Sequence, residues 1–324
     1  MRNHRLSSAA VAILAGLSAA WGPASQPAEL TGLARIRADA AAARSLVRSD
    51  LGRAFLSAVD ALPAIAERPI YHNPKTRRIL SPGSYEKADA AARAGFERDT
   101  INEENYYFTK YGTPVAYARA IDLLGQNGLS TLRGARLLDF GYGGIGHLRM
   151  LATLGCDAVG VDVDPFLHEL YSEPQDQGAV SNRAGASGRV TVLDGHWPGD
   201  AAIRRAAGKE FDIIVSKNTL KNGYIHPAEK VDKRMTIDLG ASDEEFVRAV
   251  YESLRPGGWF LIYNVCPGPN QPGKPYIPWA DGRCPFARAD LEKQGFRVVK
   301  FDESDTSTIH QFGHAFGWDA GERP

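Results

Sequence analysis

A glycine-rich turn between two apolar runs constrains this chain more than any other feature of its sequence. The run from Leu137 opens at Gly141 into Gly-Tyr-Gly-Gly-Ile-Gly, and a second apolar run ends at Asp162. This order predicts a strand, a tight loop, a helix and a second strand. Glycines at 141 and 143 let the backbone turn sharply and approach a ligand closely. The helix N-terminus that follows can receive an anionic group, so the turn predicts a ligand site.

A carboxylate stands at the tip of the second predicted strand. Asp162 lies 21 residues after Gly141, near the separation of about 20 at which an acid binds ribose hydroxyls in dinucleotide sites. The spacing Gly141-x-Gly143-x-x-Gly146 fits the same fingerprint. Asp139 weighs against a pyrophosphate, because it adds a negative charge beside the loop. A cofactor with an ammonium and a sulfonium group tolerates that charge, so these residues predict an adenosine-containing cofactor and keep NAD(P) as the alternative.

Two further motifs follow in order along the chain. A strand predicted at 189–193 ends in Asp194-Gly195, whose acid can face an adenine amino group, and Leu254-Arg-Pro-Gly-Gly258 separates a helix from a strand at 259–265. With these motifs, residues 106–324 resemble the class I S-adenosylmethionine-dependent methyltransferases. The resemblance rests on Asp139-Phe-Gly-Tyr-Gly143, Asp162, Asp194 and the Leu-x-Pro-Gly-Gly motif. The family often has a third glycine where this chain has Ile145.

The resemblance implies a methyltransferase that uses S-adenosylmethionine. It implies cofactor contacts from the turn, the strand tips and the segment before the first helix of the domain, namely Asp139, Gly141, Tyr142, Gly143, Asp162, Val163, Asp194, Gly195, Ser216 and Thr113. Thr113 can donate to a carboxylate. Tyr106, Tyr107 or Tyr111 could face the sulfonium through a cation–π contact. Helix capping and ordinary aromatic packing are the alternatives for these four side chains.

The segment after the fourth predicted strand is expected to hold the methyl acceptor, because ligands bind beyond the carboxyl ends of strands in this fold. It runs from Ser216 to His226 and lacks the Asn/Asp-Pro-Pro-aromatic motif of amino-group DNA methyltransferases. Lys217, Tyr224 and His226 are the candidates to orient or deprotonate the acceptor. An imidazole ordinarily titrates near neutral pH, which makes His226 a candidate base, and a structural or solvated histidine is the alternative.

Charge and cysteine content limit the kinds of ligand and partner that this chain is expected to bind. The chain carries 38 basic and 38 acidic side chains, so it lacks the basic balance of a dedicated nucleic-acid binder, and we expect a small-molecule acceptor. The three cysteines form no disulfide framework, although Cys266 and Cys284 could pair. No cysteine or histidine spacing predicts a metal site. Aminopropyl transfer, which shares the fold, would need a more acidic acceptor segment.

Helix-like and strand-like segments alternate through the second part of the chain. Strands are expected at 135–140, 158–163, 189–193, 211–216, 259–265 and 296–301, with an antiparallel edge strand in the tail at 308–318. This alternation predicts an α/β fold, a doubly wound, mostly parallel seven-stranded sheet of the Rossmann-like methyltransferase type, over 106–324. Residues 28–105, with helical spacing at 30–62 and 84–96, are expected to form a helical N-terminal extension or lid.

The first residues have the layout of a secretory signal peptide. Met1 to Arg5 is basic, residues 6–21 carry no charge, and Ser18-Ala-Ala20 offers small residues for cleavage. We therefore expect residues 1–20 to direct export to the periplasm, without stable membrane insertion. A misassigned start or an alanine-rich helix, and with it a cytoplasmic location, is the alternative. Because the cofactor is made in the cytosol, export keeps open a non-catalytic protein that retains the fold.

Overall fold

The computed structural model describes residues 30–182, 185, 187–267 and 273–318. The chain divides into two units, Met1–Leu30 and Thr31–Pro324. The predicted signal peptide at 1–20 lies outside the described residues. Within the described residues, no helix has the length and apolar character needed to cross a bilayer.

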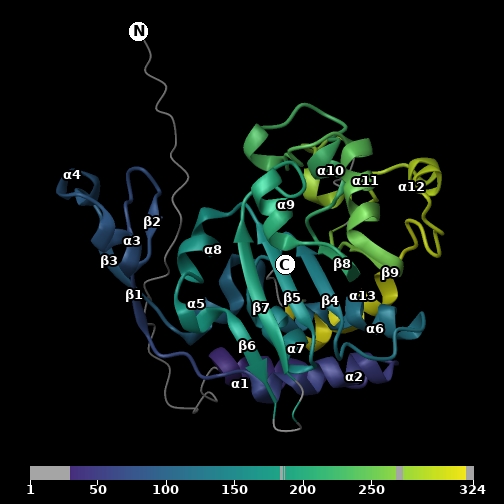
Figure 1. Cartoon of the computed structure of the whole chain (residues 1–324), viewed down its shortest axis with the longest axis horizontal. Coiled ribbons are helices and arrows are strands. Elements are labelled where there is room, and N and C mark those ends of the chain that lie inside the picture. The colour runs from purple at the N-terminus through teal and green to yellow at the C-terminus, as the bar shows by residue number, and fades with distance from the viewer. Residues whose placement is uncertain (1–29, 183–184, 186, 268–272, 319–324) are drawn as a thin grey trace. The chain divides into compact units, whose positions relative to one another are not determined.

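A six-stranded sheet forms the centre of the second unit (Figure 1). Its order is β6-β7-β5-β4-β8-β9, and every neighbouring pair is parallel except β6 with β7. The strands are β4 Arg136–Phe140, β5 Asp157–Asp162, β6 Gly178–Ser181, β7 Ser187–Asp194, β8 Phe211–Lys217 and β9 Leu254–Tyr263. The chain moves from β4 outward to β7 and then returns to β8, beside β4. That reversal creates the switch point at which open α/β sheets bind ligands.

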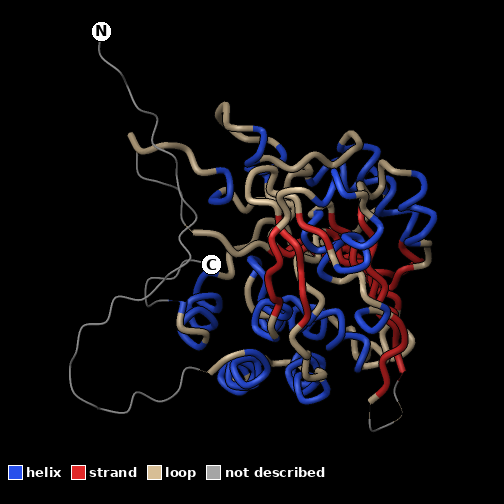
Figure 2. The backbone as a smooth tube through the Cα atoms, turned by 90° about the vertical axis from the view of Figure 1, so that its left-hand side faces the viewer, coloured by secondary structure: helices blue, strands red, loops and turns tan. Residues whose placement is uncertain are grey.

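Helices cover both faces of this sheet, and Figure 2 shows the strands between them. Successive residues of a strand pack on opposite faces of the sheet, because side chains alternate along a strand. Leu137 and Ile213 belong to one cluster, whereas Leu138 and Ile214 belong to the other. The first cluster includes residues of α1 Gly32–Ala43, α2 Asp50–Ser57, α6 Ala118–Gln126 and α7 Gly146–Thr153. The second includes residues of α9 Ala201–Ala207, α11 Asp243–Ser253 and α12 Arg288–Gln294.

Five of the predicted parallel strands are confirmed, but the seven-stranded sheet is wrong for the described residues. Residues 296–301 form no strand, and the predicted edge strand at 308–318 is largely the helix α13 Thr306–Ala315. Phe312 and Phe316 both belong to the first core cluster. Their spacing of four residues is the period of a helix, not of a strand. The antiparallel edge is instead β6, whose sequence carries little apolar alternation.

Two residue patterns that mark the ends of helices are confirmed. Ser242 and Glu245 form a capping box at the start of α11. Gly295 ends α12 in the left-handed conformation, with φ of 116°. Leu254 begins β9 directly after α11, so the Leu-x-Pro-Gly-Gly motif lies at the start of that strand.

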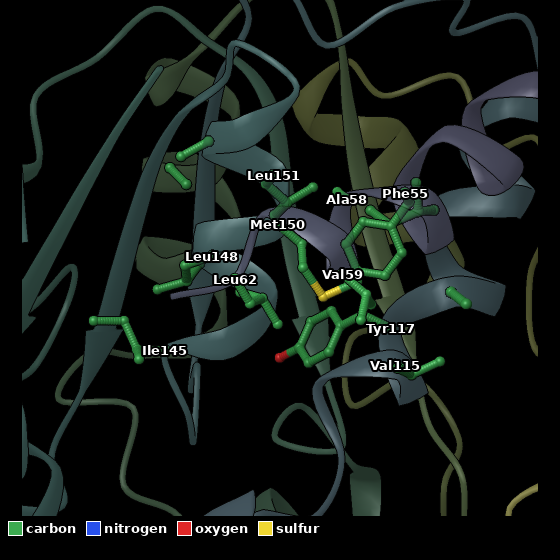
Figure 3. Packing of buried hydrophobic residues seen from close by; sticks show 14 of the residues in the cluster. Phe55, Ala58, Val59, Leu62, Val115, Tyr117, Ile145, Leu148, Met150 and Leu151 are labelled. Carbon is green, nitrogen blue, oxygen red and sulfur yellow. The ribbon is translucent and has the colours of Figure 1, made fainter. Parts of the chain in front are cut away.

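Residues 31–62 are mainly helical and belong to the main core. After α1 and α2 comes the 3-10 turn η1 Ala58–Ala61. Phe55, Val59 and Leu62 pack with Leu148 and Met150 of α7 (Figure 3). Because these side chains are buried together, the helices of residues 31–62 form a layer of the folded unit.

Residues 68–101 contain a second sheet that the sequence did not indicate. Its order is β2-β1-β3, all antiparallel, with β1 Arg68–His72, β2 Ile79–Leu80 and β3 Glu97–Ile101. The single helix predicted at 84–96 is wrong. Two short helices, α3 Pro82–Lys87 and α4 Ala90–Arg93, take its place because the Asp89 side chain caps a new helix.

Candidate functional site

The turn after β4 adopts the conformation that its glycines allow. Gly141 and Gly143 have φ values of 77° and 60°, in the left-handed region that favours glycine. A Cβ on Gly141 would overlap the Thr219 side chain, which comes from the turn after β8. The Thr219 hydroxyl also donates to the Gly141 carbonyl at 3.3 Å. The two turns that flank the switch point are therefore in direct contact.

Asp162, at the end of β5, is joined to this glycine turn. Its Oδ2 accepts from the Gly143 N–H at 3.1 Å, and its Oδ1 accepts from Val163 and Asp164 at 2.8 and 3.0 Å. Burial raises the pKa of Asp162, and the three N–H groups oppose that rise. A carboxylate has about four lone-pair sites, so one site remains for a ligand hydroxyl.

A cavity of about 1030 Å³ lies over the carboxyl ends of β4, β5 and β8, at the upper end of the volumes usual for small-molecule sites. Nine of the thirteen predicted site residues line it: Thr113, Gly141, Tyr142, Gly143, Asp162, Val163, Gly195, Lys217 and Tyr224. The structure therefore brings the glycine turn together with two of the three predicted catalytic residues. Asp139, Asp194, Ser216 and His226 are not part of this lining.

Two of these four residues are buried below the cavity. Asp139 is fully buried, and its Oδ2 lies 2.6 Å from His147 Nε2. The His147 ring stacks on Tyr117 with centroids 3.6 Å apart, and it is His147 that reaches the cavity. The Ser216 hydroxyl donates to the Phe140 carbonyl at 3.1 Å. These contacts are with protein groups, so Asp139 and Ser216 support the site from beneath.

The other two residues lie at its margins. Asp194 lines an adjoining hollow with Tyr142 and Asp162, on the side of β7. His226 is exposed and pairs with Asp243 at 2.8 Å through its Nε2. His226 therefore lies on the surface, outside the cavity lining.

The aromatic segment before α6 contributes several rings to the cavity lining, and among the three tyrosines predicted to face the sulfonium only Tyr111 is exposed. Tyr106 and Tyr107 also lie at this end, but both are buried, and their hydroxyls donate to Asp176 and to the Pro63 carbonyl. Tyr111 is 48% exposed and donates to Asp164 at 2.9 Å. A Cβ on Gly143 would lie only 2.9 Å from Tyr111 Cγ, so this ring covers the glycine turn.

Thr113 and the helix α1 form another part of the wall. The Thr113 oxygen accepts from the Val115 N–H at 3.4 Å and so caps the turn η3 Pro114–Tyr117. Burial raises the pKa of Asp39 in α1, and the interaction with the Thr113 side chain opposes that rise. The predicted capping role of Thr113 is thus present, and Arg35 and Asp39 place the helix α1 at the cavity wall.

Two lysines line the cavity at the carboxyl end of β8. Lys217 is 9% exposed and Lys221 is 4% exposed. Burial lowers the pKa of each ammonium group to about 8, and for Lys217 the charge of Lys221 adds to the effect. Lys221 Nζ donates to the carbonyls of Val265 and Trp279 at 2.9 and 3.3 Å. Lys221 was not predicted from the sequence, where nothing distinguishes it from a solvated lysine.

Lys217 has a different environment. Its Nζ lies 5.3 Å from the centroid of the Tyr117 ring, and no hydrogen bond or ion pair of this ammonium occurs among the residues described. A cation–π contact contributes up to about 2 kcal/mol when dry, whereas desolvating an ion costs several kcal/mol. The contact with Tyr117 therefore does not offset the burial of this charge.

Comparison with known proteins finds no matching family model and no matching curated protein. Among solved structures, the chain is similar to a putative sarcosine dimethylglycine methyltransferase from Galdieria sulphuraria, with 19% identity and a TM-score of 0.31 over 47% of this chain and 46% of that one. It is similar to phosphoethanolamine N-methyltransferase 2 of Haemonchus contortus, with 14% identity and a TM-score of 0.38 over 80% of this chain and 58% of that one.

A third similar structure is a TehB-like SAM-dependent methyltransferase from Corynebacterium glutamicum, with 21% identity and a TM-score of 0.24 over 46% of this chain and 71% of that one. This chain spans about half the length of the first two structures. Similarity at this level is too distant to assign an activity. The activity therefore has to follow from the residues of the site.

Proposed function

We propose that this protein is an S-adenosylmethionine-dependent methyltransferase that acts on a small-molecule acceptor. The observation that carries the proposal is the hydrogen bond between the Asp162 carboxylate and the Gly143 N–H at the cavity mouth. It sets an acid at the tip of β5 beside a glycine turn after β4, at the switch point of a parallel sheet. This is the arrangement with which such folds bind the ribose of an adenosine cofactor.

The residues present fit that cofactor at several points. Asp162 keeps an acceptor site for a ribose hydroxyl. Val163, 52% exposed at the cavity wall, offers an apolar surface to an adenine ring. Gly195 and His196 border the same end of the cavity.

When bound, the cofactor supplies an electrophilic methyl group, and the protein has to align the acceptor and exclude water. A base is needed only where the acceptor must lose a proton. Lys217 suits that role better than Tyr224, because a pKa of about 8 leaves part of the lysine neutral near neutral pH. Burial raises the pKa of Tyr224, so its phenol stays protonated and can donate a hydrogen bond to the acceptor. His226 is set aside as the base, because it is exposed and paired with Asp243.

The proposal is tested by calorimetric titration of the full-length protein with S-adenosylhomocysteine, with NADH titrated in parallel. We expect binding of S-adenosylhomocysteine alone, weakened at least about tenfold by Asp162→Ala because a hydrogen bond to a charged group is lost. Asp60→Ala, at an exposed aspartate of η1, is the matched control and should bind as the wild type does. Binding of NADH in place of S-adenosylhomocysteine would favour the oxidoreductase, and binding of neither would favour a non-catalytic protein.

Export remains a separate proposal, because residues 1–20 lie outside the described part of the chain. Expression of the full-length chain followed by N-terminal sequencing of the product is the test. Cleavage after Ala20 in an extracytoplasmic fraction would support the signal peptide. An intact N-terminus in the cytosol would contradict it.

A further inference from the structure

Lys217 is a buried cation that faces the cavity without an anionic partner. It is the last residue of β8, is 9% exposed and lines the cavity. The charges that act on it are Lys221, which repels it, and Asp139, which attracts it. Among the described residues no ion pair joins Lys217 to Asp139, whose Oδ2 is hydrogen-bonded to His147 at 2.6 Å and whose Oδ1 is buried without a hydrogen-bond partner. A buried charge of this kind requires a counter-ion, and the open side of Lys217 is the cavity.

Lys221 adds a second positive charge to the same end of the cavity. Its ammonium has three protons, and two are donated to the carbonyls of Val265 and Trp279. One proton is therefore available to a ligand. The two carbonyls also fix the position of the Lys221 ammonium group, so no rearrangement of this side chain is needed when a ligand binds.

Five acidic side chains line the cavity, and each interacts with a protein group other than the two lysines. Glu104 pairs with Arg35 at 3.2 Å, and Asp164 pairs with Lys110 at 2.7 Å. Asp238 accepts from the Gly240 N–H at 2.8 Å, and Asp39 interacts with Thr113. Asp162 accepts three backbone N–H groups. Among the described residues, no carboxylate lies within 4.0 Å of Lys217 or Lys221. This end of the cavity is thus positively charged and unneutralised.

The walls around the two lysines are largely aromatic. Tyr117 lies under Lys217 and Tyr224 lies near Lys221, with Nζ-to-centroid distances of 5.3 and 5.6 Å. Trp279, 41% exposed, lines the same cavity. Flat apolar walls beside a paired positive charge suit a compact anion with an apolar or aromatic body.

We propose that Lys217 and Lys221 form a subsite for a carboxylate group, carried either by the methyl acceptor or by the amino-acid part of the cofactor. The inference deepens the proposed function, and its cofactor alternative depends on that function. A lysine that holds a carboxylate stays protonated, so in both alternatives Lys217 is a binding group and does not act as the base. In the first case the acceptor is a small carboxylic acid. In the second case Lys217 anchors the end of the cofactor that carries the methyl group.

The test uses calorimetry on the full-length protein with two matched pairs of probes. Benzoate and its neutral analogue benzamide report on an acceptor carboxylate, and are titrated with and without S-adenosylhomocysteine. S-adenosylhomocysteine and 5′-methylthioadenosine, which lacks the amino-acid part, report on a cofactor carboxylate. The variants are Lys217→Met, which removes the charge, Lys217→Arg, which keeps it, and Lys293→Met as an exposed control.

For an acceptor carboxylate, Lys217→Met should weaken benzoate at least about tenfold and leave S-adenosylhomocysteine unchanged, because a charge-assisted hydrogen bond is lost. For a cofactor carboxylate, it should weaken S-adenosylhomocysteine by a similar factor and leave 5′-methylthioadenosine unchanged. In both cases Lys217→Arg restores most of the affinity and the neutral probes are unaffected. Circular dichroism of the variants shows whether each has folded.

The subsite is refuted if folded Lys217→Met binds benzoate and S-adenosylhomocysteine as the wild type does, or if the neutral probes weaken equally. It is also refuted if the wild type prefers neither carboxylate over its neutral partner. A wild type that binds neither nucleoside would overturn the proposed function alone. The comparison of benzoate with benzamide, made without cofactor, would then still decide the subsite.

Discussion

Asp139 and His147 are both buried, and a hydrogen bond of 2.6 Å joins Asp139 Oδ2 to His147 Nε2 under the cavity. Asp139, which in the sequence resembles a cofactor-binding acid, is thus hydrogen-bonded to a side chain of α7. Its second oxygen, Oδ1, is buried without a hydrogen-bond partner among the described residues. This pair supports the glycine turn, which lies between its two members in the chain.

Replacing His147 should destabilise the fold. We expect His147→Ala to lower the free energy of unfolding by about 3 kcal/mol, because it leaves a buried carboxylate without this partner. Urea denaturation measures the change. His310→Ala, at an exposed histidine of α13, should change stability by less than about 0.5 kcal/mol. Equal effects of the two substitutions would contradict the role given to the pair.

The same histidine should make stability depend on pH. Burial lowers the pKa of His147 below its usual 6.5. The unfolded chain therefore binds a proton that the folded chain resists, and this contribution to stability falls as pH drops below about 6.5. We expect the wild type to lose more stability than His147→Gln between pH 7 and pH 5.5, measured by urea denaturation. Parallel pH profiles would show that another group is responsible.

Binding of a carboxylate probe should weaken in alkaline solution. The pKa values of Lys217 and Lys221 are both lowered to about 8, so each ammonium loses its proton as pH rises through that value. We expect the affinity for benzoate to fall several-fold between pH 7 and pH 9, while the affinity for benzamide stays level. In Lys217→Arg the fall should be smaller, because a guanidinium keeps its charge over this range. A level benzoate profile in the wild type would argue against these lysines.

A side chain on the glycine turn should block the cofactor. We expect Gly143→Val to abolish binding of S-adenosylhomocysteine, because its Cβ would lie 2.9 Å from Tyr111 Cγ and would fill the ligand approach. The control is Gly257→Val, at a glycine with φ of 78° and no neighbour within 4 Å of its Cβ. Both changes impose strain of about 1–2 kcal/mol, but only the first should affect calorimetric binding. Retained binding in folded Gly143→Val would overturn the assignment of the turn.

The N-terminal helices should be essential for stability. Phe55 of α2 is fully buried in the cluster that also contains Met150 of α7. We expect Phe55→Ala to cost about 4 kcal/mol of unfolding free energy through the cavity that it leaves. Val299→Ala, at a residue 46% exposed, should cost less than about 1 kcal/mol. A loss for Phe55→Ala no larger than that would show that residues 31–62 are not part of the cooperative core.

Much of the central sheet and of the glycine turn could be predicted from the sequence. The strands around Leu137 and Ile213 carry consecutive apolar residues, which is typical of strands covered on both faces. Gly143 and the capping pair Ser242 and Glu245 act through the backbone within a few residues. Such features depend on local sequence alone, and they were located correctly.

The chemistry of the site depended on distant contacts. Phe312 and Phe316 are four residues apart, and only their packing in the first core cluster shows that this segment is a helix. His226 and Lys217 come from one segment, yet one pairs with Asp243 on the surface and the other is buried beside Tyr117. The sequence by itself determined five parallel strands of the central sheet and the glycine turn after the first of them. Only the tertiary structure decided which side chains are buried and which charges face each other, because burial and charge pairing are set by segments far apart in the chain.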